Sequence, residues 1–568
     1  MISKINLLNL AEFRKLPYLR PDMDKLSDAF RRCRLRLRLS MSAHAAADAV
    51  RELQPALIDF FTAEAIARNR HDRKLTDDAW QSETAFFDSA MSQVQAWTQE
   101  TYSALTASRF AEDLEAELGD GLFREARMLA ATVNDRMIAD LGEENRLESA
   151  YVEKISEISV KLNGNSYTLT ELEPYLQSSD KQMRRASHRA LCRAYEENHE
   201  WLDACFDQLV NVRRRMSRKL GYESFTELGY KRMNRIDYGR TEIELFRQMV
   251  LKYIVPVCSE IRRLQRSRLE TLQLNYWDLP VLLPGGNPTP VVPRNRFVEL
   301  VGKQISELLE ESEWLSQLAD CGYIDLEARP AKAGGGYCET LYKYGVPVIF
   351  TNATNTADDI VTLIHEAGHA YAALSSMPGM RVIEDQRPSM DVCEIHSTAL
   401  EFLTMPLLES VFGSETETAS MIHLTESLLF LPYACLVDHF QHEIYDHPEL
   451  TAPERHALWR SLEKAYQPDI DYGDDEWFES GGSWQKKEHI YTAPFYYIDY
   501  ALASMAALDL WQTANKDREK AVKRYKRLCG RGNRGTLLQQ LGESGIASPF
   551  DEGTFKRLVY AVCDYLSL

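Results

Sequence analysis

The chain has 568 residues, of which 45 % are hydrophobic, and a formal net charge of −19. This length is enough to bury a large core divided among two to four structural units. The acidic balance argues against nucleic acid as a partner, because proteins bind a phosphate backbone with clustered Lys and Arg. The sequence contains no run of eighteen uninterrupted apolar residues, so we expect no membrane partner either.

The ten cysteines are spread along the chain without a C-x-x-C pair. This usage is typical of a reducing compartment, so we expect free thiols. Residues 5–10 form a short apolar run, but it is too brief for the apolar part of a secretion signal and is followed by Arg14 and Lys15. The sequence therefore predicts a cytoplasmic protein.

Residues 22–150 have a helical pattern, with apolar residues such as Leu53, Leu57 and Phe60 at three- and four-residue spacing. Arg31 to Arg38 form a basic run in which Arg alternates with Leu. That alternation suits an element buried on one side, and an anionic partner is the alternative interpretation.

Residues 160–169, VKLNGNSYTL, predict two short strands joined at Asn163-Gly164. Helices resume from Thr170, and Pro256 is expected to kink or divide the long helical stretch over residues 237–275. We place one boundary after residue 195. It separates an N-terminal helical lobe, residues 1–195 with the hairpin, from a second lobe over residues 196–568.

Residues 334–352 are the second region with a β pattern. The three glycines at 334–336 permit close approach of another backbone, and Val346, Val348 and Phe350 alternate with other residues. Because Pro347 cannot donate a hydrogen bond inside a ladder, we predict an edge strand here. An edge strand offers free main-chain groups to an extended peptide. An ordinary strand under the following helix is the alternative.

Residues 356–370, TADDIVTLIHEAGHA, predict a helix that Thr356 caps with Asp359 as its partner. His365 and His369 lie one turn apart on this helix, with Glu366 beside them. Two such imidazoles can bind one metal at about 2.0–2.1 Å and leave the glutamate free to act on a bound water. The pattern predicts a zinc site, and a helix with two ordinary histidines is the alternative.

A catalytic zinc needs a third protein ligand and one open position. Ser389 can cap a second helix, on which Glu394 shares a face with Asp391 and Glu401. Carboxylates beside apolar residues are costly unless something binds them. We predict Glu394 as the third ligand, with Asp391 or Glu401 orienting a ligand imidazole. A solvated acidic stripe is the alternative.

The pattern H-E-x-G-H at residues 365–369, followed by E-I-H-S-x-x-x-E at residues 394–401, resembles the zinc oligopeptidases of the thimet oligopeptidase and oligoendopeptidase F family. Within that family it is most similar to bacterial oligoendopeptidase F and Pz-peptidase. The resemblance continues through residues 213–235, 334–338, 346–352 and 489–500. It covers the chain from about residue 160 onward, is looser over residues 529–545, and gives no specific match in the first third.

This resemblance implies a mainly α-helical, two-lobed metallopeptidase with a small β-sheet beside the zinc helix and a deep substrate channel. It implies one Zn²⁺ per chain in the second lobe, bound by His365, His369 and Glu394. Glu366 would act as general base and then general acid, so we predict a zinc endopeptidase that cleaves internal bonds of short unstructured peptides. The alternatives are a zinc exopeptidase and an inactive helical peptide-binding scaffold. The sequence does not decide between a monomer and a homo-oligomer.

The resemblance also implies contacts with the substrate. In the family a histidine and tyrosines point at the substrate carbonyl, and a tyrosine hydroxyl can bond an oxyanion without carrying charge. The corresponding positions here are His489, Tyr497 and Tyr500, with Tyr496 as the substitute if the alignment shifts by one residue. Without the resemblance, these tyrosines would be interpreted as helix core. A further set, expected to pair with or line the peptide, consists of Gly335, Gly336, Tyr337 and Val348.

Overall fold

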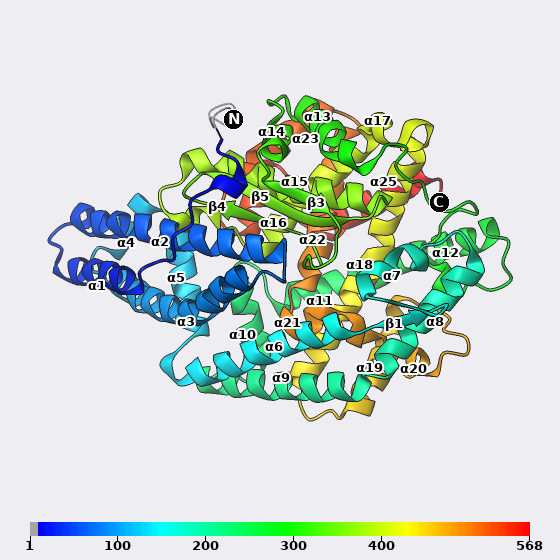
Figure 1. The fold of residues 1–568 in the computed structure, drawn as a ribbon, viewed down its shortest axis with the longest axis horizontal. Coiled ribbons are helices and arrows are strands. Elements are labelled where there is room, and N and C mark those ends of the chain that lie inside the picture. The colour runs from blue at the N-terminus through cyan, green and yellow to red at the C-terminus, as the bar shows by residue number, and fades with distance from the viewer. Residues whose placement is uncertain (1–9) are drawn as a thin grey trace. The chain divides into compact units, whose positions relative to one another are not determined.

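The structure is a computed structural model that describes residues 10–568, and helices make up 71 % of it (Figure 1). Within the described residues there are two small sheets, of two and three strands. The three-stranded sheet packs against the helix that carries His365 and His369. The prediction of a mainly α-helical fold with a small sheet beside this helix is therefore confirmed.

The chain forms two compact units, each assembled from three separate segments. The first contains Met1–Ala131, described from residue 10, together with Thr289–Thr416 and Ala507–Ile546. The second contains Thr132–Pro288, Glu417–Ala506 and Ala547–Leu568. These segments do not follow the single boundary after residue 195 that the sequence suggested. Helical periodicity shows which face of a helix is apolar, but not which other helix covers that face.

The elements of the first unit include a three-stranded sheet, β3 (Ile324–Glu327), β4 (Tyr337–Leu341) and β5 (Val346–Ala353). Its helices are α1 (Met23–Leu39), α2 (Ala43–Asp72), α3 (Asp78–Thr106), α4 (Ala111–Leu118), α5 (Asp120–Thr132), α13 (Phe297–Leu309), α14 (Trp314–Asp320), α15 (Ala357–Ser376), α16 (Met390–Thr404), α17 (Glu409–Phe412), α23 (Arg518–Cys529) and α24 (Leu537–Ser544).

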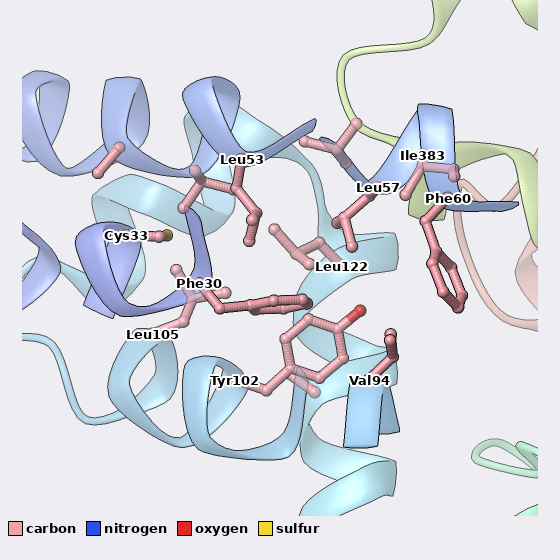
Figure 2. Close-up of a cluster of buried hydrophobic side chains, with 14 of the residues drawn as sticks. Phe30, Cys33, Leu53, Leu57, Phe60, Val94, Tyr102, Leu105, Leu122 and Ile383 are labelled. Atoms are coloured by element: carbon pink, nitrogen blue, oxygen red, sulfur yellow. The ribbon is translucent and has the colours of Figure 1, made fainter. Parts of the chain in front are cut away.

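The N-terminal helices of this unit pack around one apolar cluster (Figure 2). Leu53, Leu57 and Phe60 of α2 point into it, as their spacing predicts, and Phe30 and Tyr102 contribute aromatic rings to it. In α1, Phe30, Cys33 and Leu37 are buried while the arginines between them are exposed or half-buried. The basic run therefore belongs to a helix buried on one side, as predicted.

The three-stranded sheet has the order β3-β5-β4, so β5 is its central strand. The prediction of an edge strand at residues 346–352 is wrong. Pairing of β5 with β3 begins only at Ile349, whose N–H faces β3 and donates to the carbonyl of Tyr323. The nitrogen of Pro347, two residues earlier, faces the same side. Pro347 is tolerated because β3 does not yet pair at that point, so no ladder hydrogen bond needs its missing N–H. The outer strand on the other side is β4, antiparallel to β5.

Helix α15 begins as predicted and lies against this sheet. The Thr356 hydroxyl accepts from the N–H of Asp359, and the Asp359 carboxylate accepts in return from the N–H of Thr356. Ile360 and Leu363 are fully buried, and α15 packs against both β4 and β5. This packing fixes which side of α15 carries its two histidines.

The second unit contains the predicted hairpin, β1 (Val160–Leu162) and β2 (Asn165–Tyr167), joined through Asn163 and Gly164 with positive φ. Its helices are α6 (Ile138–Glu157), α7 (Leu169–Leu176), α8 (Lys181–Glu196), α9 (His199–Leu220), α10 (Phe225–Arg232), α11 (Arg240–Met249), α12 (Val255–Arg268), α18 (Thr416–Asp446), α19 (Ala452–Tyr466), α20 (Glu476–Glu479), α21 (Glu488–Thr492), α22 (Tyr497–Ala514, whose last part belongs to the first unit) and α25 (Glu552–Leu566).

The division of one long helical stretch in this unit follows from its sequence. A π-helical turn, Val250–Ile254, separates α11 from α12 just before Pro256, so the long helical stretch is divided where proline predicts.

Among the described residues one stretch, Glu409–Asp446, is long and apolar enough to cross a membrane. More than half of its apolar window, 56 %, is buried inside the structure, which accounts for that composition.

Candidate metal centre

Helices α15 and α16 bring together the three predicted ligands. The Nε2 atom of His365 lies 3.3 Å from Nε2 of His369 and 3.2 Å from Oε2 of Glu394. The third separation, between His369 Nε2 and Glu394 Oε2, is 3.8 Å. Bonds of about 2.0–2.1 Å at tetrahedral angles place ligand atoms about 3.3–3.4 Å apart, so these residues fit a zinc ion. No other such group occurs among the described residues.

The two helices can approach this closely because of Gly368. A Cβ atom at this position would lie 2.6 Å from the carbonyl oxygen of His396 and 2.6 Å from the Cα of Ser397. Both obstacles are backbone atoms of α16, so α15 and α16 cross almost in contact one residue before His369. The spacing of the histidines alone gives this glycine no role. Its position inside H-E-x-G-H is the signal that could have found it.

The charge of the cluster favours a bound cation. His365 lies between two carboxylates, with Nδ1 2.6 Å from Oε1 of Glu401 and Nε2 facing Glu394. Burial by itself lowers the pKa of His365, but its bonds to Glu394 and Glu401 raise it well above the usual value. In contrast, burial lowers the pKa of His369 to about 4. Carboxylates that hold a proton on a buried imidazole attract a metal cation for the same reason.

Glu366 is buried beside the ligands and is not one of them. Its Oε2 atom has no hydrogen-bond partner within the described structure. Burial, helped by the nearby carboxylates Glu394 and Glu401, raises the pKa of Glu366 to about 7. An acceptor that is buried and unsatisfied costs free energy, and such groups are typical of sites that bind or react.

The two carboxylates expected to orient an imidazole occupy different places. Glu401 contacts His365 Nδ1 directly, which fixes the ring with Nε2 toward the other ligands. Asp391 is buried in the first turn of α16, where it accepts from the Ser389 hydroxyl and from the N–H of Val392.

The residues predicted to hold a peptide along the sheet fall on two strands. Gly335, with a φ of +80°, and Gly336 are exposed just before β4. Tyr337 begins β4, and its hydroxyl accepts from Asn69 and donates to Asp72 of α2. Val348 lies instead on the central strand, where it is fully buried and registers with Glu339. Of these residues, Tyr337 therefore lies on an outer strand, β4, and Val348 does not.

The aromatic residues predicted to act on the carbonyl form one cluster in the second unit. The ring of His489 lies 4.9 Å from that of Tyr497 and 6.0 Å from that of Tyr500, and Tyr496 lies 5.0 Å from Tyr500. Tyr497 is 7 % exposed, and its hydroxyl accepts from the ammonium group of Lys487 at 3.0 Å. Tyr496 and Tyr500 are half-buried. Lys487 is not among the residues that the sequence predicts for this site.

Paired histidines from one helix, a glutamate from the next and a buried carboxylate beside them define a metal-dependent hydrolase of the H-E-x-x-H class. The chain belongs to peptidase family M3. The model of Peptidase family M3 matches residues 174–559, and that of the Peptidase M3 N-terminal domain matches residues 13–133. The predicted family resemblance is therefore confirmed, and it includes the first third of the chain, where the sequence reasoning found no match.

Solved structures agree over nearly the whole chain. Pz peptidase A with an inhibitor is 34 % identical, with a TM-score of 0.94, over 98 % of this chain and 99 % of that one. A structure assigned to oligoendopeptidase F is 35 % identical, with the same TM-score and coverage. Another, from Bacillus anthracis str. Ames, is 34 % identical with a TM-score of 0.90 over 98 % of both chains. A comparison with curated protein sequences finds no match.

Replacing Gly368 with Ala should damage the metal centre. The new Cβ meets α16 backbone that cannot rotate away, so the helices must separate and Glu394 must move from the histidines. We expect a destabilisation of about 1–3 kcal/mol, measured by chemical denaturation, and a lower content of bound zinc, measured by mass spectrometry. Gly542→Ala is the matched control, because a Cβ there meets nothing within 4 Å. Equal zinc content in the two variants would contradict this role of Gly368.

Proposed function

We propose that the chain is a zinc-dependent endopeptidase that hydrolyses internal bonds of short, unstructured peptides. The observation that carries the proposal is the triangle of His365, His369 and Glu394 with the unsatisfied carboxylate of Glu366 beside it. The names of the similar structures, Pz peptidase A and oligoendopeptidase F, support cleavage of peptides at internal bonds. The ten free cysteines support the proposed cytoplasmic location.

In this proposal His365, His369 and Glu394 would hold one Zn²⁺, which when bound would lower the pKa of a water toward about 7 and polarise the scissile carbonyl. Glu366 takes a proton from the attacking water and gives it to the leaving amine. A carboxylate that is not a metal ligand can perform both transfers, as the base before the attack and as the acid after it. Glu401 accepts the Nδ1 proton of His365 and thereby keeps its Nε2 lone pair available to the metal.

The remaining assignments extend the family resemblance. His489, Tyr497 and Tyr500 donate hydrogen bonds to the oxygen of the peptide carbonyl as negative charge develops there, with Tyr496 as the substitute. An extended peptide pairs with the outer edge of β4, next to Gly335, Gly336 and Tyr337. Val348 supports this strand from the centre of the sheet and contributes no free main-chain edge.

An exopeptidase and an inactive scaffold remain the alternatives, and one experiment separates them. Peptides of about five to forty residues, blocked at both ends, are incubated with the protein and their products mapped by mass spectrometry. Internal cuts that stop with a chelator and return with added zinc support the endopeptidase. Trimming of free-ended peptides alone would support an exopeptidase, and the absence of any cleavage would support the scaffold.

Changing Glu366 to Gln should abolish hydrolysis while zinc stays bound, because Glu366 is the base and not a ligand. Losing a general base costs about 10²–10⁴-fold in kcat. The measurement is kcat on a blocked peptide together with zinc content. Near-normal activity at full zinc occupancy would sink the assignment of Glu366.

Changing Glu394 to Ala should lower the zinc content, since it removes one of three protein ligands. We expect the affinity for zinc to fall by at least about tenfold, measured by competition with a metal-binding dye. Glu409→Ala, which removes an exposed carboxylate from the same unit, is the control. Unchanged affinity in the Glu394 variant would move the third ligand elsewhere.

A further inference from the structure

The residue before the tyrosine cluster has an unusual backbone conformation. Phe495 has a φ of +67°, although it is a bulky aromatic residue, and its side chain is fully buried. Such residues rarely adopt the left-handed region, and they stay there only when the surroundings hold them. Tyr496 follows Phe495 directly, and α22 begins at Tyr497. The strained residue thus lies immediately before the proposed catalytic side chains.

The main chain of Phe495 is bound on both sides by buried side chains. Its N–H donates to Oε1 of Gln441 at 2.9 Å, and its carbonyl accepts from Nη2 of Arg235. The same Nη2 atom donates to Oδ1 of Asp499 at 2.7 Å. Asp499 belongs to the first turn of α22, between Tyr497 and Tyr500. One guanidinium group therefore joins the strained residue to the turn that carries the tyrosines.

The ring of Phe495 is enclosed as completely as its backbone. Ring centroids lie 5.1 Å away at His442, 5.5 Å at Tyr230 and 5.5 Å at Tyr445. The enclosure is itself fixed, because the Tyr230 hydroxyl lies 2.8 Å from Nε2 of His442. Gly229 also lies against this ring, since a Cβ at that position would lie 2.5 Å from Cδ2 of Phe495. A side chain larger than glycine at position 229 must displace this ring.

The first turn of a helix has no preceding turn to hold it, so it frays unless other groups fix it. In α22 this first turn carries both Tyr497 and Tyr500. Their hydroxyls can stabilise a developing oxyanion only if they are held near the required position, since errors of about 1 Å cost on the order of a hundredfold in rate. The rigidity of the turn at Phe495 therefore bears on catalysis.

We propose that Arg235, Gln441 and Gly229 are positioning residues, which hold Phe495 in its strained conformation and thereby orient the tyrosine hydroxyls for reaction. None of the three needs to touch the substrate. The inference rests on the proposed function, in which at least Tyr500 donates to the substrate carbonyl.

The test compares Gly229→Ala with Gly142→Ala. Both glycines lie inside helices of the second unit, but a Cβ at Gly142 meets nothing within 4 Å. We expect Gly229→Ala to lower kcat on a blocked peptide by about tenfold or more, with KM within about twofold and zinc content unchanged. Gly142→Ala should keep the wild-type kcat. Equal kcat in the two variants, or a change confined to KM, would overturn the inference.

A second variant covers the case in which Gly229→Ala does not fold. Gln441→Met keeps about the same side-chain length but removes the acceptor for the Phe495 N–H. It should lower kcat in the same way, with circular dichroism showing that the fold is retained. A folded Gln441→Met protein with normal kcat would also overturn the proposal.

A double-mutant cycle separates positioning from general destabilisation. If the positioning residues act through the Tyr500 hydroxyl, Gly229→Ala should lower kcat much less in a Tyr500→Phe background than in the wild type. Effects that simply multiply would overturn the inference while leaving the role of Tyr500 intact. If Tyr500→Phe alone keeps full kcat, the proposed role of Tyr500 fails, and the positioning inference fails with it.

Discussion

The crossing of α15 and α16 at Gly368 is the constraint on which the metal centre depends. It brings Glu394 within 3.2 Å of His365 although the two residues belong to different helices. The sheet under α15 sets the orientation of the histidines, and Glu401 sets the rotation of one imidazole. Several buried ionisable groups share this small volume, which is costly without a cation. Together these features describe a centre organised to bind metal.

The tyrosine cluster of the second unit depends on a constraint of a similar kind. At Phe495 the chain adopts a conformation that a bulky residue avoids, and buried hydrogen bonds hold it there. The metal centre thus lies beside Gly368, where the absence of a Cβ lets the α16 backbone come close. The tyrosine cluster lies beside Gly229, where the absence of a Cβ lets the Phe495 ring come close. Tight packing next to a reactive group limits the motion of that group, and this is how folded proteins fix catalytic geometry.

Local patterns in the sequence predicted much of this, because the physics behind them is local. The Thr356 cap, the i and i+4 histidines and the turn at Gly164 depend only on neighbouring residues. The errors concern long-range pairing. Pro347 suggested an edge strand, but its missing N–H faces a side where β3 has not yet begun. The assembly of each compact unit from three segments likewise depends on which distant segments meet, which periodicity does not encode. The contact of Lys487 with Tyr497, ten residues apart, depends on the path of the chain between α21 and α22, which periodicity does not encode either.

The two glycines have different freedom to change during evolution. The space at Gly229 is closed by a side chain, so a larger residue there is compatible with a smaller residue at position 495, and the two positions can drift together. The space at Gly368 is closed by a carbonyl oxygen and a Cα, which every amino acid carries. No second substitution in α16 can make that room. Among related chains, position 229 should therefore vary in concert with position 495, while position 368 should resist exchange whatever α16 contains.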